Sequence, residues 1–121
     1  EGGSACPPTA AGTATLFYAG IHEDDAITRG LDYLTRNALL GPGRQPNQAH
    51  YFYGQYYAVQ AMYLARGKYW DRWWPAVRTE LIERQATNGG WFDNHAGQAY
   101  ATSMALIVLQ MPKRYLPIFQ R

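Results

Sequence analysis

The most constraining feature of this sequence is an alternation between two kinds of helical segment. Apolar residues recur at helical spacing along the chain, and the two-residue alternation typical of strands is hard to find. The segments at about 9–19, 50–66 and 98–110 are apolar on nearly every side. Those at about 24–37 and 71–85 carry one apolar stripe and charged residues elsewhere. The chain is therefore predicted to be all-α.

The alternation also predicts how the helices are arranged. A helix that is apolar all round must be covered on more than one side, whereas a helix with one apolar stripe can face water. Inner helices covered by outer helices are therefore expected. Residues 10–20 align with 57–67, and Tyr57-Ala58 aligns with Tyr100-Ala101, which are shifts of 47 and 43 residues. Such a period suits one helical hairpin per repeat, in either a superhelix or a closed ring.

A few residues set the expected ends and faces of the outer helices. Asp24 or Asp25 is expected to cap the second helix, because a carboxylate accepts the free N–H groups of a first turn. Pro75 has no backbone N–H and is expected in a first turn, so the fourth helix is predicted to begin at about residue 71. Glu80 and Arg84 are expected as an i,i+4 pair on the charged side of that helix.

Composition excludes several classes of protein. The chain has 121 residues, the length of one domain, and its 47% hydrophobic content suffices for a packed core. A net charge of +2 without basic clusters indicates no nucleic-acid-binding surface. The longest apolar run, 104–109, is far shorter than the ~18 residues of a membrane span. One cysteine, Cys6, excludes an internal disulfide and a multi-cysteine zinc site. No cellular compartment is indicated.

Residues 85–91, Gln-Ala-Thr-Asn-Gly-Gly-Trp, fit the pattern Gln-x3-Gly-x-Trp. This pattern resembles the QW repeat motif of the terpenoid cyclase and protein prenyltransferase superfamily, the squalene-cyclase-like α/α toroids. Tyr100-Ala101-Thr102 and Thr9-Ala10-Ala11-Gly12, which open two inner helices, are similar to that family as well. The resemblance covers about residues 9–110. Glu80 replaces the aromatic residue that these motifs often carry five positions before the Gln.

The resemblance implies that residues 1–121 form a single partial toroid domain of about two and a half helical hairpins, from the C-terminal part of such a ring. Gln85, Gly89 and Trp91 would be a structural motif that ties the end of an outer helix to the loop before the next inner helix. The Gln85 amide is expected to bind free carbonyls at the helix end and to pack on the Trp91 ring. Gly89 is expected to supply the turn.

The catalytic motifs that the resemblance implies are absent from this chain. There is no Asp-x-Asp-Asp, and the nearest run, Glu23-Asp24-Asp25, is expected to cap a helix. The zinc-binding prenyltransferase subunits use an Asp, a Cys and a His. Cys6 is suitably placed, but Ser4 and Ala101 stand where the other two ligands are expected. No metal and no cofactor are predicted, and the sequence leaves open whether the chain is an enzyme.

Asp93 and His95 are the remaining candidates for a catalytic pair. An Asp and a His two positions apart at the mouth of a helical ring can act as an acid and a base. The alternative is a glycine-rich loop in which the Asp is bonded to the backbone and the His is solvated. His22 and His50 lie at expected helix starts and indicate no chemistry.

The expected helix at 50–66 carries most of the aromatic residues that suggest a ligand. Aromatic walls attract apolar and cationic groups, so these tyrosines are candidates to line a ligand cavity. The alternative is that they only fill the core. The candidates are Tyr53, Tyr56, Tyr57 and Tyr63.

The sequence thus predicts a repeat fragment of a prenyltransferase- or squalene-cyclase-like protein that binds an isoprenoid-like apolar ligand. One alternative is a non-catalytic α-repeat module that binds a peptide, glycan or lipid. Another is a fragment of an α/α-barrel carbohydrate-active enzyme, for which Asp93 is the one candidate carboxylate. Two and a half hairpins do not close a ring, so the exposed apolar flanks are expected to meet a second copy of the chain or the rest of a longer chain.

Overall fold

The structure is a computed structural model of the chain, and it describes residues 6–37 and 51–113. Within these two ranges there are five α-helices, a short 3₁₀ helix and no strand, so the all-α prediction is confirmed. The elements are α1 (Cys6–Tyr18), α2 (Asp25–Asn37), α3 (Tyr51–Ala65), α4 (Gly67–Arg84), α5 (Gly97–Gln110) and η1 (Met111–Lys113). None of these helices is long and apolar enough to cross a membrane.

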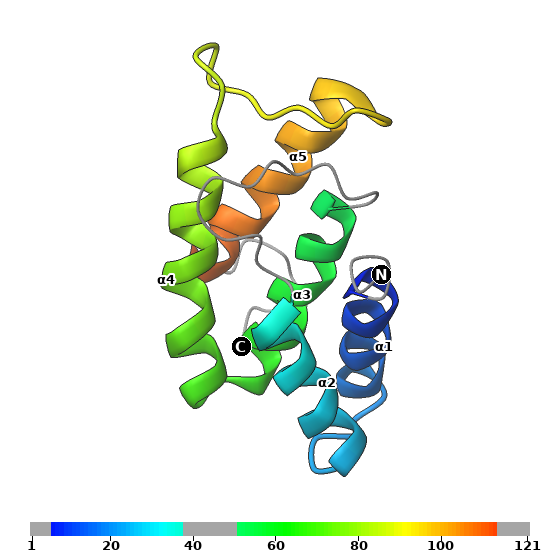
Figure 1. Cartoon of the computed structure of the whole chain (residues 1–121). Helices are drawn as coiled ribbons and strands as arrows, with labels where there is room; N and C mark the ends of the chain where they lie inside the picture. The colour runs from blue at the N-terminus through cyan, green and yellow to red at the C-terminus, as the bar shows by residue number, and fades with distance from the viewer. Residues whose placement is uncertain (1–5, 38–50, 114–121) are drawn as a thin grey trace.

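The helices alternate in direction and in position. In Figure 1, α1, α3 and α5 run one way, and α2 and α4 run the opposite way. α1 and α5 both pack on α3, while α2 packs mainly on α1, and α4 packs on α3. α3 contacts each of the other four helices and is the centre of the fold. The chain therefore forms a layer of α1, α3 and α5 with α2 and α4 against it.

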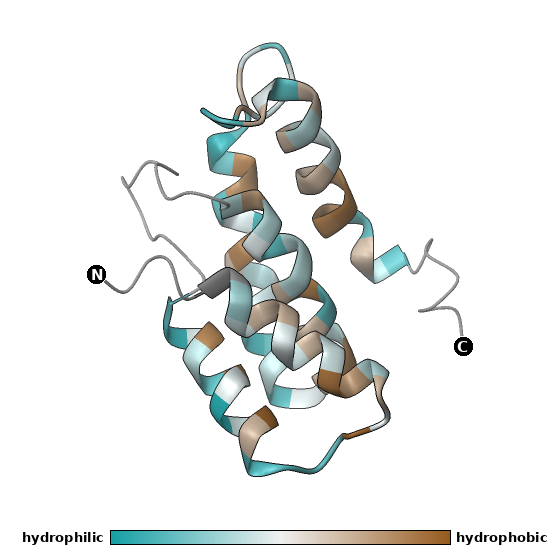
Figure 2. Ribbon diagram, turned by 90° about the vertical axis from the view of Figure 1, so that its right-hand side faces the viewer, coloured by the Kyte–Doolittle hydropathy of each residue, from teal (hydrophilic) through white to brown (hydrophobic). Residues whose placement is uncertain are grey.

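Burial follows the two kinds of helix seen in the sequence. α2 buries one stripe, Ile27, Leu31 and Leu34, whereas α3 buries residues on most sides because helices surround it. In Figure 2 the stretch that joins α1 to α2 is largely hydrophilic, and hydrophobic residues recur along the helices. The largest fully buried side chains are Trp73, Phe52, Leu34, Met62, Leu81, Val59, Val77 and Val108.

α4 begins earlier than the sequence predicts. It starts at Gly67, so Pro75 lies in the helix interior and not in the first turn. The proline leaves the carbonyl of Asp71 without its usual N–H partner, but both residues are exposed and water can bind that carbonyl. Only Arg66 separates α3 from α4, and its backbone has a positive φ of 59°.

A cap begins α2, and a close approach joins it to α1. Asp24 provides the expected cap, since its Oδ1 accepts the Ala26 N–H at 2.7 Å. Gly30 lies against Thr13: a Cβ at Gly30 would sit 2.3 Å from the Thr13 Oγ1. α1 begins at Cys6, three residues before its predicted start, because Pro7 and Pro8 occupy the first turn, where a proline needs no N–H partner.

Candidate functional site

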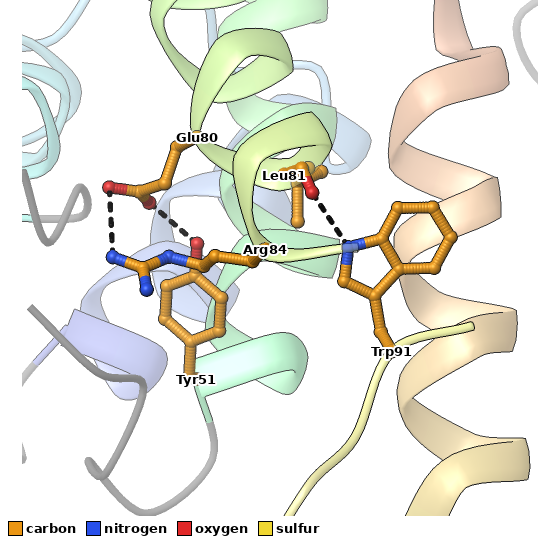
Figure 3. Close-up of polar contacts among 5 residues, drawn as sticks. All are labelled: Tyr51, Glu80, Leu81, Arg84 and Trp91. Atoms are coloured by element: carbon orange, nitrogen blue, oxygen red, sulfur yellow. Dashed lines mark hydrogen bonds and ion pairs between the residues drawn. The ribbon is translucent and has the colours of Figure 1, made fainter. Parts of the chain in front are cut away.

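Trp91 caps the C-terminal end of α4, as Figure 3 shows. Its side chain is 2% exposed, and its Nε1–H donates to the Leu81 carbonyl at 2.8 Å. That carbonyl lacks its helical partner because the Gln85 N–H binds the Ile82 carbonyl instead, at 3.2 Å. The indole therefore satisfies one of the free carbonyls at the helix end.

Gln85 has a different partner from the one expected. Its Nε2 donates to the Gly89 carbonyl at 2.7 Å and not to a carbonyl of α4. The chain leaves the helix in an extended conformation at Gln85 and turns back at Gly89, where φ is 89°. The side chain therefore closes this turn, together with the 2.7 Å bond from the Ala86 N–H to the Gly90 carbonyl. Of these two side chains, it is that of Trp91 that binds a carbonyl at the end of α4.

Thr102 fixes the same segment to α5. Its Oγ1 accepts the Trp91 N–H at 2.9 Å and donates to the Trp91 carbonyl at 3.2 Å. Gly90 allows this close approach, because a Cβ there would lie 2.6 Å from Gln98 Nε2 and 3.0 Å from Thr102 Oγ1. The sequence does not reveal this role of Thr102, because the role depends on how α5 packs.

Asp93 caps the turn that leads into α5. Its side chain is 7% exposed, and its Oδ1 accepts the N–H groups of His95 at 2.8 Å and Ala96 at 2.7 Å. The His95 side chain is exposed, and its recorded bond to Asp93 runs through the backbone. Asp93 is thus bonded to the backbone of its own loop, and the His95 side chain is exposed. This is the arrangement expected from the sequence as the alternative to an acid and base pair.

Three of the four candidate tyrosines share one side of α3. Tyr51 marks the side that faces α4, because its hydroxyl donates to Glu80. Tyr53, Tyr56 and Tyr57 lie about 140° to 240° around the helix from Tyr51, on the opposite half. The rings of Tyr53 and Tyr57 are 4.9 Å apart and those of Tyr56 and Tyr57 are 5.0 Å apart, both edge to face.

Tyrosines from α1 and α5 extend this group. The Tyr18 hydroxyl donates to Gln60 Oε1, and the Gln60 Nε2 donates to the Tyr56 carbonyl at 2.9 Å. Burial, and then the neighbouring Tyr56 and Tyr57, raise the pKa of Tyr18 to about 12. Tyr100 of α5 completes the set. We call these five residues the tyrosine face: Tyr18, Tyr53, Tyr56, Tyr57 and Tyr100.

Tyr100 lies one turn into α5, the helix that packs on α3 as α1 does. Burial raises the pKa of Tyr100, and the negative charge of Asp93 and the phenol of Tyr53 raise it further. Sequence reasoning missed Tyr18 as a member of this face. Tyr100 could have been identified as a member, because residues 57–58 align with residues 100–101 and Tyr100 is therefore the repeat equivalent of Tyr57.

Tyr63 lies apart from the tyrosine face. It is two turns beyond Tyr56 on α3, and its ring meets that of Trp70 edge to face, with centroids 5.3 Å apart. Trp70 stacks in turn on Trp74 at 5.1 Å. The structure therefore places this fourth candidate with the tryptophans of α4.

A buried polar network joins α3 to α4 (Figure 3). The Tyr51 hydroxyl donates to Glu80 Oε2 at 2.5 Å, and Arg84 Nη2 lies 4.0 Å from Glu80 Oε1. Tyr51 and Glu80 are 5% and 7% exposed. The sequence predicts Glu80 on the charged side of its helix, but Tyr51 provides a partner that lets the carboxylate be buried.

The Tyr51 phenol is expected to make the fold sensitive to alkali. Burial raises the pKa of Tyr51, as does the charge of Glu80, with Arg84 opposing them. The unfolded chain loses this proton near the ordinary value of 10.0, whereas the folded protein retains it. The free energy of unfolding should therefore fall above about pH 10 by about 1.4 kcal/mol per pH unit from this group. Tyr51→Phe should flatten that fall in urea titrations, and equal slopes for the two proteins would contradict this prediction.

The other candidates for chemistry are not brought together. His22 lines an open polar hollow at the α1–α2 connection with Glu23, Asp24 and neighbouring residues, and Asp24 is already engaged as the cap. Among the residues that the structure describes, no group of three His, Cys, Asp or Glu side chains is placed to hold a metal. Ser4, His50 and the side chain of Cys6 lie outside the described part of the chain.

Comparison with protein-family models, with curated proteins and with solved structures finds no match to this chain. What the chain does is therefore inferred from its own residues and from the resemblance of residues 85–91.

Proposed function

We propose that this chain is a repeat segment of a prenyltransferase- or squalene-cyclase-like α/α toroid, and that its tyrosine face binds an isoprenoid-like apolar ligand. One observation carries the proposal: the tyrosine face is built from α1, α3 and α5, and its α3 members lie across that helix from Tyr51, the residue that binds Glu80 of α4. Neighbouring helices that present the same chemistry on one side can line a shared cavity.

The exposure of these side chains supports binding. Tyr18 and Tyr53 are 42% and 37% exposed, although large aromatic side chains gain free energy when they are covered. The hydroxyl groups of Tyr18 and Tyr53 have partners in Gln60 and Tyr57, which reduces the cost of covering them with an apolar ligand. The proposal assigns binding and no reaction, because the acid motif and the zinc ligand set are absent.

The proposal also assigns a partner to α5. Leu106 on this helix is 43% exposed. α5 packs on α3 as α3 packs on α1, so the next hairpin of the same repeat is the segment that would cover this flank.

Titration with geranylgeraniol, followed by the intrinsic fluorescence of the protein, tests the proposal. We expect saturable binding that Tyr57→Ala weakens about tenfold, because loss of a central aromatic contact costs about 1.4 kcal/mol or more. Tyr33→Ala is the matched control, since it removes a half-buried tyrosine from α2. That variant should bind like the wild type.

A parallel titration with maltohexaose separates the alternative functions. Saturable binding of the sugar that depends on Tyr57, without binding of geranylgeraniol, would make the tyrosine face a glycan site and overturn the proposal. The absence of saturable geranylgeraniol binding, or equal losses in Tyr57→Ala and Tyr33→Ala, would overturn it too.

A further inference from the structure

The turn that follows α4 carries an asparagine directly before a glycine. Asn88 and Gly89 are both exposed, and the loop that holds them projects beyond the end of α4 in Figure 1, so water and hydroxide can reach them. Asparagine is a thermolabile residue, because the main-chain nitrogen that follows it can attack its side-chain amide. A glycine in that place leaves the nitrogen unshielded, and a Cβ built at Gly89 would have nothing within 4 Å beyond its chain neighbours.

A main-chain donor is placed on the oxygen that this attack would charge. The Gly90 N–H donates to Asn88 Oδ1 at 3.0 Å. When the Gly89 nitrogen adds to the side-chain carbonyl carbon of Asn88, negative charge develops on Oδ1. An N–H group about 2.7–3.1 Å from such an oxygen stabilises the developing charge. The turn therefore favours the addition through the same bond that fixes the Asn88 side chain.

Asn94 provides a comparison within the same chain, because it is exposed as well. The attacking nitrogen is bonded through its N–H at both sites. The Gly89 N–H donates to the Ala86 carbonyl at 2.9 Å, and the His95 N–H donates to Asp93 Oδ1 at 2.8 Å. Asn94, however, precedes a residue with a side chain, and its side-chain oxygen has no recorded hydrogen bond from the described residues. The two sites thus differ in the two features that favour the reaction.

We propose that Asn88 is a modification site, at which the side-chain amide is lost through a cyclic imide and the resulting isoaspartate opens the turn before Trp91. Hydroxide first takes the proton of the Gly89 nitrogen, since the lone pair of a peptide nitrogen is otherwise delocalised. This nitrogen bonds to the side-chain carbonyl carbon of Asn88, and the bond from that carbon to the amide nitrogen breaks. Ammonia leaves with a proton from water, which regenerates the hydroxide. A second water opens the imide at either carbonyl and gives aspartate or isoaspartate.

The isoaspartate product is the one that changes the turn. Its main chain runs through the former side chain and gains a methylene group. Bonds from the Ala86 N–H to the Gly90 carbonyl, at 2.7 Å, and from the Gly89 N–H to the Ala86 carbonyl close this turn, and the added atom enters both rings. Trp91 follows the turn directly, so its cap on α4 should weaken. The aspartate product keeps the original main chain and an Oδ1 that can accept the Gly90 N–H.

Incubation of the chain at mildly alkaline pH, followed by mass spectrometry of its peptides, tests the chemistry. Each modified site shows the gain in mass that replacement of NH₂ by OH produces, and the aspartate and isoaspartate peptides separate by chromatography. We expect Asn88 to react at least about tenfold faster than Asn94, with isoaspartate among the products. Equal rates at the two sites, or an intact Asn88, would overturn the proposal.

His95→Gly separates the two features that favour Asn88. It places a glycine after Asn94 and retains the N–H that Asp93 binds, but it adds no donor to the Asn94 side-chain oxygen. We expect Asn94 of this variant to react faster than in the wild type and still more slowly than Asn88 of the same molecule. Equal rates would overturn the role assigned to the Gly90 N–H.

Urea denaturation of the separated products tests the effect on the fold. We expect the isoaspartate form to unfold at a lower urea concentration than the fresh wild type. Fresh Asn88→Asp is the control for the added charge and should unfold like the wild type. Asn88→Ser has no amide to lose and should keep its urea midpoint through the same incubation. An isoaspartate form as stable as Asn88→Asp would overturn the opening of the turn. These tests involve no ligand of the tyrosine face, so their outcome is independent of the proposed function.

Discussion

Replacement of Trp91 with alanine is expected to lower the free energy of unfolding by about 3–5 kcal/mol, the usual range for a large buried aromatic residue. The side chain is 2% exposed and lies where α4, the loop after it and α5 meet. Its loss leaves a cavity and also leaves the Leu81 carbonyl without a donor. Urea denaturation followed by circular dichroism measures the change.

Trp91→Phe separates these two contributions. Phenylalanine keeps most of the buried ring but has no N–H, so the expected loss is about 1–3 kcal/mol. Phe92→Ala is the matched control, because its side chain is the next aromatic residue in the chain and is 62% exposed. It should change the stability by about 0.5 kcal/mol or less. If Trp91→Phe were as stable as the wild type, the cap on α4 would not contribute to folding.

The fold was predictable where the evidence lies within one helix. The stripe of Ile27, Leu31 and Leu34 requires only helical spacing, and the structure buries all three residues. Pro75 misled the prediction because its cost depends on its surroundings: an exposed Asp71 carbonyl can bind water, which local sequence does not disclose.

The candidate site was predictable to a smaller extent. Tyr53, Tyr56 and Tyr57 share a face by helical spacing alone. The addition of Tyr18 requires the packing of α1 on α3, which brings it to Gln60, 42 residues further along the chain. The burial of Glu80 likewise requires Tyr51 of another helix. Contacts between helices are therefore harder to predict from the sequence than the helices themselves.

Glu80→Ala is expected to destabilise the protein by about 3–5 kcal/mol, because removal of one partner from a buried charged network leaves the others uncompensated. The Tyr51 hydroxyl would lose its acceptor at 2.5 Å, and the largely buried Arg84 would lose the carboxylate that lies 4.0 Å away. Glu83→Ala is the matched control, since Glu83 is an exposed glutamate on the same helix. Its effect should be about 0.5 kcal/mol or less.

A double-mutant cycle locates the source of the loss. Tyr51→Phe and Glu80→Ala together should cost less than the sum of the single changes, with a coupling energy of about 0.5–3 kcal/mol, because the hydroxyl and the carboxylate bind each other. Additive losses would mean that the hydrogen bond between α3 and α4 contributes nothing. A loss below 1 kcal/mol for Glu80→Ala would mean that Arg84 finds enough water without the carboxylate, and that the network is not effectively buried.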